Sequence, residues 1–306
     1  MKKTLLLILI LSLLGCARQS TTHLQTSGMQ ILTSLKATKL LTQTLTQDTG
    51  IKTILSVPPT YSMNSQARYF KKHARKFNEQ AANAAACVTI RSIWMQDNLY
   101  PYARRANVRI VEIDGSAPVD KTQAGVKLVR DKGSGYVSPF IWRSPGNLTK
   151  MADFIAKDLM ALYPDQAAII DNNLKSLKQD LFKLRTKYES KFIELESTEV
   201  ISLTGDFDYL LSEFGIEVVE SLQKQAIDWD EKDVAALEKA ITKNDVNAVI
   251  CKRMPQGRIY EIIVNSGAHP VVLTTLVTAN TPHLPARKRL LAFYAENLDR
   301  IFKGFK

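Results

Sequence analysis

The stretch at residues 138–147 reads Ser-Pro-Phe-Ile-Trp-Arg-Ser-Pro-Gly-Asn, and Met-Ala-Asp follows at residues 151–153. The proline at position 145 stands just before apolar residues that recur every three or four positions, as on one side of a helix. These residues are Leu148, Met151, Ile155, Leu159 and Leu162. The spacing predicts a helix over residues 147–162, and leucines at similar spacing predict a second, longer helix over residues 164–192.

Short apolar runs alternate with helical patterns on both sides of this helical middle. Strands are predicted at residues 51–57, 87–93, 108–113, 199–203, 216–219, 246–251 and 270–274. Helices are predicted at residues 67–84, 99–106, 207–214, 233–242, 260–266 and 286–302. Such alternation is typical of parallel, doubly wound sheets. The predicted fold class is therefore α/β, with parallel sheets flanked by helices.

The first fifteen residues have the pattern of an export signal. Lys2 and Lys3 precede an apolar run at residues 5–14, which is too short to cross a bilayer, because a spanning helix needs about 20 residues. Leu-Leu-Gly-Cys at residues 13–16 is similar to a bacterial lipobox, which implies cleavage before Cys16 and acylation of its thiol. Residues 16–35 are predicted to hold the lipidated cysteine and a polar tether. The chain is thus expected to be exported and lipid-anchored at the periplasmic or outer surface of a cell membrane.

The composition supports a protein with real cores and a basic surface. Hydrophobic residues make up 45% of the chain, and its formal net charge of +11 falls to +9 when residues 1–15 and their two lysines are removed. The positive charge is dispersed, without the dense tract and interleaved aromatics that would predict nucleic-acid binding. In an exported protein it favours contact with anionic lipid or cell wall, or simply solubility. Cys87 and Cys251 lie in apolar runs and are predicted to be buried free thiols.

Residues 138–153 resemble the segment D-P-H-x-W-L-x-P-x-N-(x)n-M-A of the zinc and manganese ABC transporter substrate-binding lipoproteins. These are the cluster A-I receptors of the helical backbone metal receptor superfamily. A second segment begins at residue 207, reads Phe-x-Tyr-Leu-x-x-x-Phe-Gly-Ile, and resembles H-x-A-F-x-Y-L-x-x-x-Y-G-L of the same family. The resemblance covers about residues 36–302. It implies two α/β lobes joined by one rigid backbone helix, with a ligand cleft between them.

The resemblance also implies how the chain is divided. The predicted signal peptide covers residues 1–15 and the tether residues 16–35. An N-terminal lobe then covers residues 36–144, the backbone helix with the following long helix covers 145–196, and a C-terminal lobe covers 197–306.

The family binds its metal with three histidines and acidic residues, and this chain has other residue types at those positions. They are Asn64, Phe140, Thr204, Lys252 and Thr274. Phenylalanine has no donor atom and a lysine ammonium has no free lone pair, whereas zinc or manganese needs three or four donors at about 2.0–2.2 Å. We therefore predict a divergent member without the family's metal site and with no cofactor, zinc or manganese being implied by the resemblance alone. Two partial substitutes stay open: Asp206 and Asp208 beside the third position, and a soft copper(I) site from Met63, Met254 and Cys251.

Positive side chains stand at or next to the former ligand positions. Arg143, beside Trp142, and the pair Lys252 and Arg253 suit carboxylate or phosphate oxygens if they face a cleft. One hypothesis is a cleft that holds a small anion or a negatively charged chelate. The other is that these side chains point to solvent or pair across closed lobes. The predicted cleft residues are Asn64, Phe140, Trp142, Arg143, Thr204, Asp206, Lys252, Arg253 and Thr274.

Two functions follow from these observations. The first is a monomeric, extracytoplasmic substrate-binding lipoprotein that delivers cargo to an ABC permease, which is the partner implied by the resemblance. The second is a fold retained as a non-metal binder or as an interaction module on the membrane surface. The sequence has no nucleophile–base set, Gly-rich phosphate loop or metal-hydrolase motif, so an enzyme is not expected.

Overall fold

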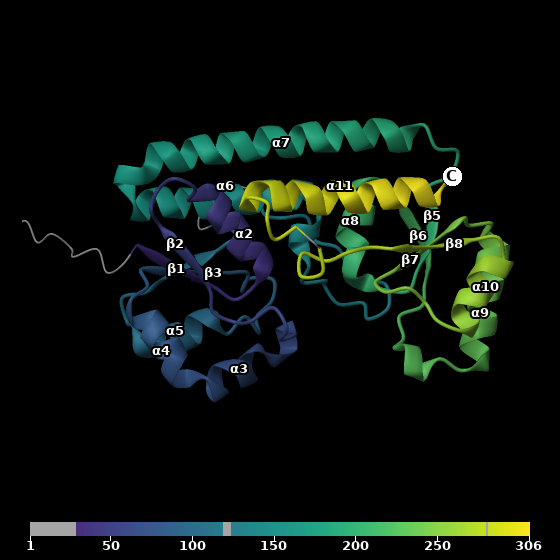
Figure 1. The fold of residues 1–306 in the computed structure, drawn as a ribbon, viewed down its shortest axis with the longest axis horizontal. Helices are drawn as coiled ribbons and strands as arrows, with labels where there is room; N and C mark the ends of the chain where they lie inside the picture. Colours follow the sequence, from purple (N-terminus) through teal and green to yellow (C-terminus); the bar gives the residue numbers. More distant parts are fainter. Residues whose placement is uncertain (1–28, 119–123, 280) are drawn as a thin grey trace, which may run out of the picture.

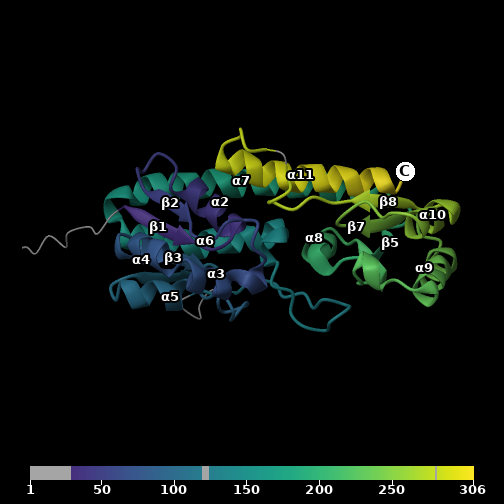
Figure 2. The same ribbon diagram turned by 60° about the horizontal axis from the view of Figure 1, so that its bottom comes forward.

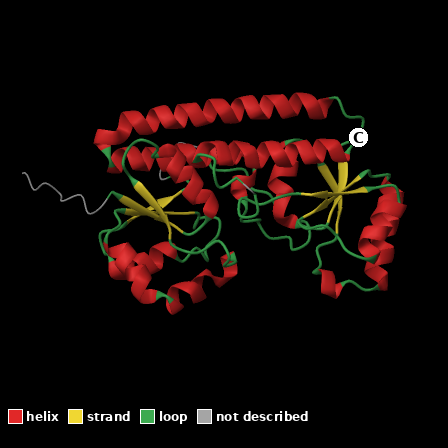
Figure 3. Ribbon diagram, viewed as in Figure 1, coloured by secondary structure: helices red, strands yellow, loops and turns green. Residues whose placement is uncertain are grey.

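The computed structural model describes residues 29–118, 124–279 and 281–306. The described chain contains two four-stranded sheets, ordered β2-β1-β3-β4 and β6-β5-β7-β8, and every pairing is parallel. The strands of the first lobe are β1 (Gln30–Thr33), β2 (Lys52–Leu55), β3 (Ala86–Thr89) and β4 (Val111–Asp114). Those of the second are β5 (Glu199–Ser202), β6 (Glu217–Ser221), β7 (Ala248–Cys251) and β8 (His269–Val272). The predicted fold class is confirmed (Figure 3).

Helices cover both faces of each sheet (Figure 1). In the first lobe these are α2 (Lys36–Leu45), η1 (Met63–Ser65), α3 (Gln66–Lys72), α4 (Ala74–Ala82) and α5 (Leu99–Ala106). In the second they are η4 (Gly205–Phe207), α8 (Asp208–Glu213), η5 (Ala226–Asp228), α9 (Glu231–Asn244) and α10 (Arg258–Asn265). The strands carry apolar residues on both faces. Ile31 joins the core on the inner face and Leu32 the separate cluster under α3, α4 and α5, because successive side chains of a strand point to opposite faces.

The two lobes are joined by a layer of long helices. α6 (Pro145–Leu162), after the short η2 (Ile141–Arg143), leads through η3 (Pro164–Gln166) into α7 (Ala167–Ile193), and α11 (Ala286–Gly304) lies beside α7. Figure 1 shows α7 extending along both lobes. The inner faces of both sheets and these helices share one continuous apolar core. A long helix therefore connects the two lobes, as predicted, and α6 and α11 pack beside it.

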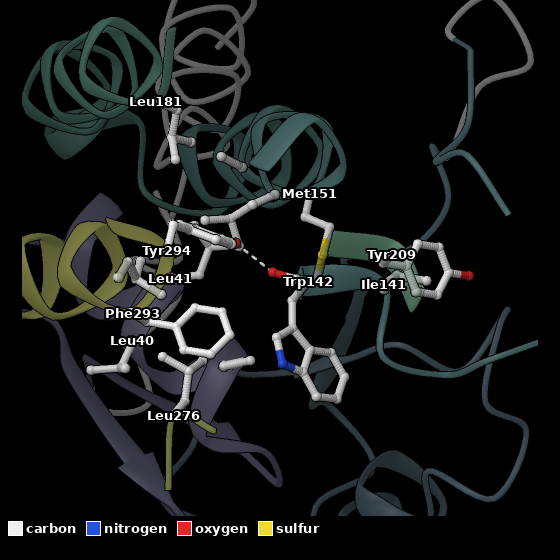
Figure 4. Close-up of a cluster of buried hydrophobic side chains, with 14 of the residues drawn as sticks. Leu40, Leu41, Ile141, Trp142, Met151, Leu181, Tyr209, Leu276, Phe293 and Tyr294 are labelled. Atoms are coloured by element: carbon white, nitrogen blue, oxygen red, sulfur yellow. Dashed lines mark hydrogen bonds between the residues drawn. The ribbon is translucent and has the colours of Figure 1, made fainter. Parts of the chain in front are cut away.

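The stretch at residues 138–147 anchors the start of this layer. The Ser144 hydroxyl accepts a hydrogen bond from the Asn147 amide at 2.9 Å and so caps α6. The Tyr294 hydroxyl, from α11, donates to the Trp142 carbonyl, and Met151 packs in the same cluster (Figure 4). The motif identified in the sequence thus joins α6, α11 and the second lobe, where Tyr209 Oη donates to the Ser138 carbonyl at 3.0 Å.

Two predictions about the first lobe are wrong. Strand β1 lies within the range 16–35 that was predicted as tether, and it is the strand that pairs with both β2 and β3. Its four residues are followed by α2, a helix rich in threonine, a residue of low helix propensity. Burial of apolar side chains stabilises this strand, because Ile31 and Leu32 are fully buried. The helix predicted over residues 67–84 is divided at His73, whose backbone leaves the helical region, so that α3 and α4 are separate.

The remaining predictions about the chain ends and cysteines have different outcomes. The signal sequence, Cys16 and the tether up to residue 28 lie outside the described residues. Cys87 and Cys251 are buried free thiols as predicted, and burial raises the pKa of both, that of Cys251 to about 12. Within the described ranges, no helix combines the length and apolar character needed to cross a membrane.

Candidate functional site

A cleft of about 660 Å³ lies between the two lobes. It is lined by residues 34–37, 55, 57–64, 66, 139–140, 142–143, 252–253 and 275–278, with Trp94 and Asp206. Apart from the segment 139–143, each lining segment follows the carboxyl end of a strand, which is where α/β sheets place ligand sites. Seven of the predicted cleft residues line it: Asn64, Phe140, Trp142, Arg143, Asp206, Lys252 and Arg253.

Two cations share one carboxylate at the centre of this cleft. The Asp206 Oδ2 atom lies 3.4 Å from Arg143 Nη2 and 2.5 Å from Lys252 Nζ. Asp206 belongs to η4 after β5, Lys252 follows β7, and Arg143 comes from the segment that enters α6. The triad therefore ties the interlobe segment to the second lobe. Its members differ in burial, because the Arg143 side chain is 5% exposed whereas that of Lys252 is 50% exposed.

Arg143 is held between two aromatic rings. Its guanidinium carbon lies 4.2 Å from the centre of the Phe140 ring and 4.7 Å from that of Phe207. Phe140 in turn meets Trp142 edge to face at 5.7 Å. Burial lowers the pKa of the guanidinium, and the charge of Asp206 opposes this change. Phe140 thus forms part of a cation–π site.

Two of the predicted cleft residues do not line the cleft. The Thr204 side chain accepts a hydrogen bond from the Asp206 amide at 3.2 Å and caps η4. The Thr274 amide donates to Asn297 Oδ1 at 2.8 Å, which joins the end of β8 to α11. Both threonines are thus used to hold the chain just beyond a strand end.

Sequence reasoning missed cleft residues of the first lobe. Lys36 starts α2 directly after β1, and burial, followed by the charges of Arg289 and Lys39, lowers the pKa of its ammonium. Tyr61, Met63 and Trp94 add apolar and aromatic surface. Lys36 was missed because its strand was interpreted as tether. Trp94 follows β3, and an inspection of the residues after each predicted strand could have found it.

The donor groups in the cleft do not fit a zinc or manganese ion. In the described part of the chain, no group of three or more His, Cys, Asp or Glu side chains is placed to hold a metal ion. Asp206 is the one cleft carboxylate among the lining residues, and both of its described ion-pair partners are cations. The soft alternative is not assembled either: Met63 lines the cleft, Met254 lines a different surface pocket, and the buried Cys251 thiol donates to the Val249 carbonyl.

A second buried carboxylate lies close to this triad. Asp208, at the start of α8, is 8% exposed, and its Oδ2 atom has no hydrogen-bond partner among the described residues. Burial, followed by the negative charge of Asp131, raises its pKa to about 7. Asp131 belongs to a hairpin closed by the bridge between Arg130 and Val137.

This hairpin reaches the second lobe. Gln223 Nε2 donates to Asp131 Oδ2 at 3.1 Å, and Lys132 Nζ donates to the Val218 carbonyl of β6. Asp131 also leaves no room for a Cβ atom at Gly205 in η4. A segment from outside the second lobe therefore lies against η4 and close enough to the buried Asp208 to act on its charge.

The family model described as ZnuA, zinc-uptake complex component A, periplasmic, matches residues 93–304. Among solved structures, a mutant of FpvC from Pseudomonas aeruginosa is similar with a TM-score of 0.72 and 17% identity, over 90% of this chain and 98% of that one. A crystal structure of ZnuA is similar with a TM-score of 0.64 and 16% identity, over 89% of this chain and 98% of that one. Zn(II)-bound AdcA from Streptococcus pneumoniae is similar with a TM-score of 0.68 and 16% identity, over 90% of this chain and 57% of that one. These likenesses show the fold. No curated protein matches this chain.

Proposed function

The chain belongs to the family described as the periplasmic zinc-uptake component ZnuA, and from this premise we propose that it is an extracytoplasmic receptor that binds a solute and delivers it to an ABC permease. The family consists of solute-binding proteins rather than enzymes. The structural neighbours support the same role, since FpvC has been solved with Ni2+ and with Mn2+ and AdcA with Zn(II). The cleft between two parallel sheets is the place where such a receptor holds its cargo.

The cargo we propose is a small anion or a negatively charged chelate rather than a bare divalent ion. The observation that carries this proposal is the ion triad of Arg143, Asp206 and Lys252. A divalent ion bound to Asp206 would stand next to a guanidinium and an ammonium, and repulsion between like charges is strong in a site with little water. Asp206 would also have to give up both partners.

Two further cations of the cleft remain available to a ligand. Lys36 and Arg253 line it, and no carboxylate of the described residues lies within ion-pair distance of either. Lys252 is half exposed, so its ammonium can contact both Asp206 and a ligand. Because Tyr61 and Trp94 of the first lobe also line it, the cleft suits a ligand with a negative group and an apolar or aromatic body.

A second candidate function is favoured by the same triad. Arg143 and Lys252 are already paired with Asp206, so the protein itself supplies the carboxylate that these two cations need. The fold would then serve as an interaction module on the membrane surface. Under either function we propose that residues 1–15 are removed on export, that the lipidated Cys16 anchors a monomer to the membrane, and that the protein lies on the periplasmic or outer side.

The two functions differ in what the purified protein carries. Native mass spectrometry and elemental analysis of protein purified without refolding are expected to find an organic or phosphate-bearing anion and less than stoichiometric metal. Stoichiometric zinc or manganese that persists on dialysis would overturn the proposed cargo. An empty protein would support the interaction module.

Titration tests the same proposal with defined probes. Zinc chloride and manganese chloride are expected to leave the melting temperature unchanged, and citrate or zinc citrate to raise it. The Arg253→Gln variant should lose most of that rise. Lys243→Gln is the matched control, because Lys243 is exposed on α9 and lies outside the cleft. Equal responses of the two variants would show that binding is not in the cleft.

A further inference from the structure

The equivalent outer parts of the two lobes carry very different charge. The segments are residues 56–110, from the end of β2 to the start of β4, and residues 222–268, from the end of β6 to the start of β8. They hold equivalent places because both sheets have the same strand order. The first has nine lysines and arginines against two acidic residues, a formal charge of +7. The second has seven of each, a formal charge of zero. Most of the chain's net charge of +11 thus lies on one part of one lobe.

All nine cations of the first segment are exposed, and we call this surface the basic layer. They are Arg68, Lys71, Lys72, Arg75, Lys76, Arg91, Arg104, Arg105 and Arg109. Of the two acidic residues, Asp97 is fully buried and Glu79 pairs with Arg75 at 3.3 Å. The only other ion pair described for the layer joins Arg91 to Glu112 at 4.0 Å. Little negative charge of the protein itself therefore compensates the basic layer.

Five of these cations lie at residues 68–76, and the fold adds four more from further along the chain. α3 and α4 lie before β3 in the chain, and α5 lies after it. Packing brings them together: the Tyr102 ring of α5 stacks on Phe70 of α3 at 5.2 Å, and the Arg105 guanidinium lies 4.7 Å from the centre of the Tyr102 ring. Figure 2 shows α3, α4 and α5 on the same side of the first lobe. None of the nine cations lines the cleft, so the layer is separate from the cargo site.

We propose that the basic layer binds the phosphate headgroups of anionic phospholipids at a membrane surface. Seven of the nine cations are spread over α3, α4 and α5, and Arg91 and Arg109 lie in the segments that adjoin β3 and β4. Such a spread suits a broad anionic surface better than a single small ligand. Each Lys or Arg close to such a surface strengthens binding about fivefold, and the attraction falls off within about one Debye length. The described chain also begins on this lobe, with β1 at Gln30, so an anchor at Cys16 attaches the protein to the membrane through the lobe that carries the layer.

Binding through the basic layer would orient the protein on the membrane. α7 and α11 lie on the opposite side of the first sheet from α3, α4 and α5 (Figure 1). A lipid anchor fixes the distance from the membrane but leaves the direction free, whereas a basic layer next to the anchor selects one direction. The helices α3 to α5 would face the lipid, and the long helices α7 and α11 would face away from it.

The test uses the chain from residue 17 onward, which contains every described residue and no lipid anchor. Sedimentation with vesicles of phosphatidylcholine alone is compared with sedimentation with vesicles containing about one third phosphatidylglycerol, at about 0.1 M and about 0.5 M salt. We expect binding to the anionic vesicles at the lower salt and its loss at the higher. The triple variant Lys71→Gln, Lys72→Gln, Lys76→Gln should reduce the partition coefficient about tenfold or more.

A matched control separates the basic layer from net charge. The triple variant Lys232→Gln, Lys239→Gln, Lys243→Gln removes the same charge from three exposed lysines of α9 and should change binding less than about twofold. Melting temperatures of both variants verify that they fold. The proposal is overturned if both variants lose binding equally, if the vesicles show no preference for phosphatidylglycerol, or if the protein binds heparin but not anionic vesicles.

Discussion

The two lobes have the same sheet inside and different surfaces outside. Their strand orders match and all their strands are parallel, yet the outer segment of the first lobe carries +7 and that of the second carries no net charge. They also contribute differently to the cleft, since Lys252, Arg253 and Asp206 come from the second lobe whereas Trp94 and Tyr61 come from the first. Packing constrains the residues that face each sheet, whereas the exposed positions are free to follow function. Substitutions at the junction of the lobes are expected to have the largest effects on stability.

The largest effect is expected at the junction itself. Arg143→Ala removes a buried cation from Asp206 and from the Phe140 and Phe207 rings, and it should lower the free energy of unfolding by about 3–5 kcal/mol. Lys252→Ala removes a half-exposed cation from the same carboxylate and should cost about 1 kcal/mol or less. Urea unfolding followed by circular dichroism gives both values. Similar costs for the two variants would show that burial of Arg143 does not stabilise the junction.

A smaller effect is expected at two buried carboxylates, one in each lobe. Asp97 accepts hydrogen bonds from Ile90 N at 3.1 Å, Ser34 Oγ at 3.0 Å and Leu99 N at 3.4 Å, and burial raises its pKa to about 6. Asp208 has the higher pKa, about 7, and an unpartnered Oδ2 atom. Because the folded protein binds a proton at Asp208 more tightly than the unfolded chain does, this residue lowers stability as the pH rises from about 4 to about 7.

Asparagine at the two positions should therefore have opposite consequences. Asp208→Asn should raise the free energy of unfolding by about 2 kcal/mol at pH 8 and change it little at pH 4, where the carboxyl is protonated in the folded protein and about half protonated in the unfolded chain. Asp97→Asn should lower it by about 1–3 kcal/mol at pH 8, because an amide nitrogen cannot accept the hydrogen bonds that the carboxylate accepts. Thermal unfolding between pH 4 and pH 8 measures both. A loss of stability in Asp208→Asn at pH 8 would contradict the assignment.

The sequence predicted the fold well because the fold depends on local patterns. The apolar spacing at residues 148–162 and the alternation of strands and helices are properties of consecutive residues. β1 was missed because four residues in a polar setting carry too little pattern, and only pairing with β2 and β3 makes them a strand. The positions of Phe140 and Lys252 at the cleft followed from the resemblance. Their pairing did not, because the distance from Lys252 to Asp206 depends on how segments far apart in the chain pack together. The basic layer also depends on such packing, because it brings α5 beside α3.

The smallest effect is expected where the hairpin of residues 130–137 meets the second lobe. Asp131→Asn removes the negative charge that, after burial, raises the pKa of Asp208 most, so that pKa should fall below its value of about 7. The fall in stability with rising pH should move to lower pH accordingly. The free energy of unfolding at pH 8 should change by less than about 1 kcal/mol, because Asp131 bonds Gln223 at the surface.

The measurement is the carboxyl titration of Asp208 by NMR, with Asp233→Asn as the matched control. Asp233 is an acidic residue of α9 whose partner is Lys224 at 2.6 Å, and it is not among the groups that shift the pKa of Asp208. An unchanged titration of Asp208 in the Asp131→Asn variant would show that the hairpin does not lie against α8 in solution. Equal shifts in both variants would mean that Asp208 responds to overall charge, and the junction would then be no more specific than the outer surfaces of the two lobes.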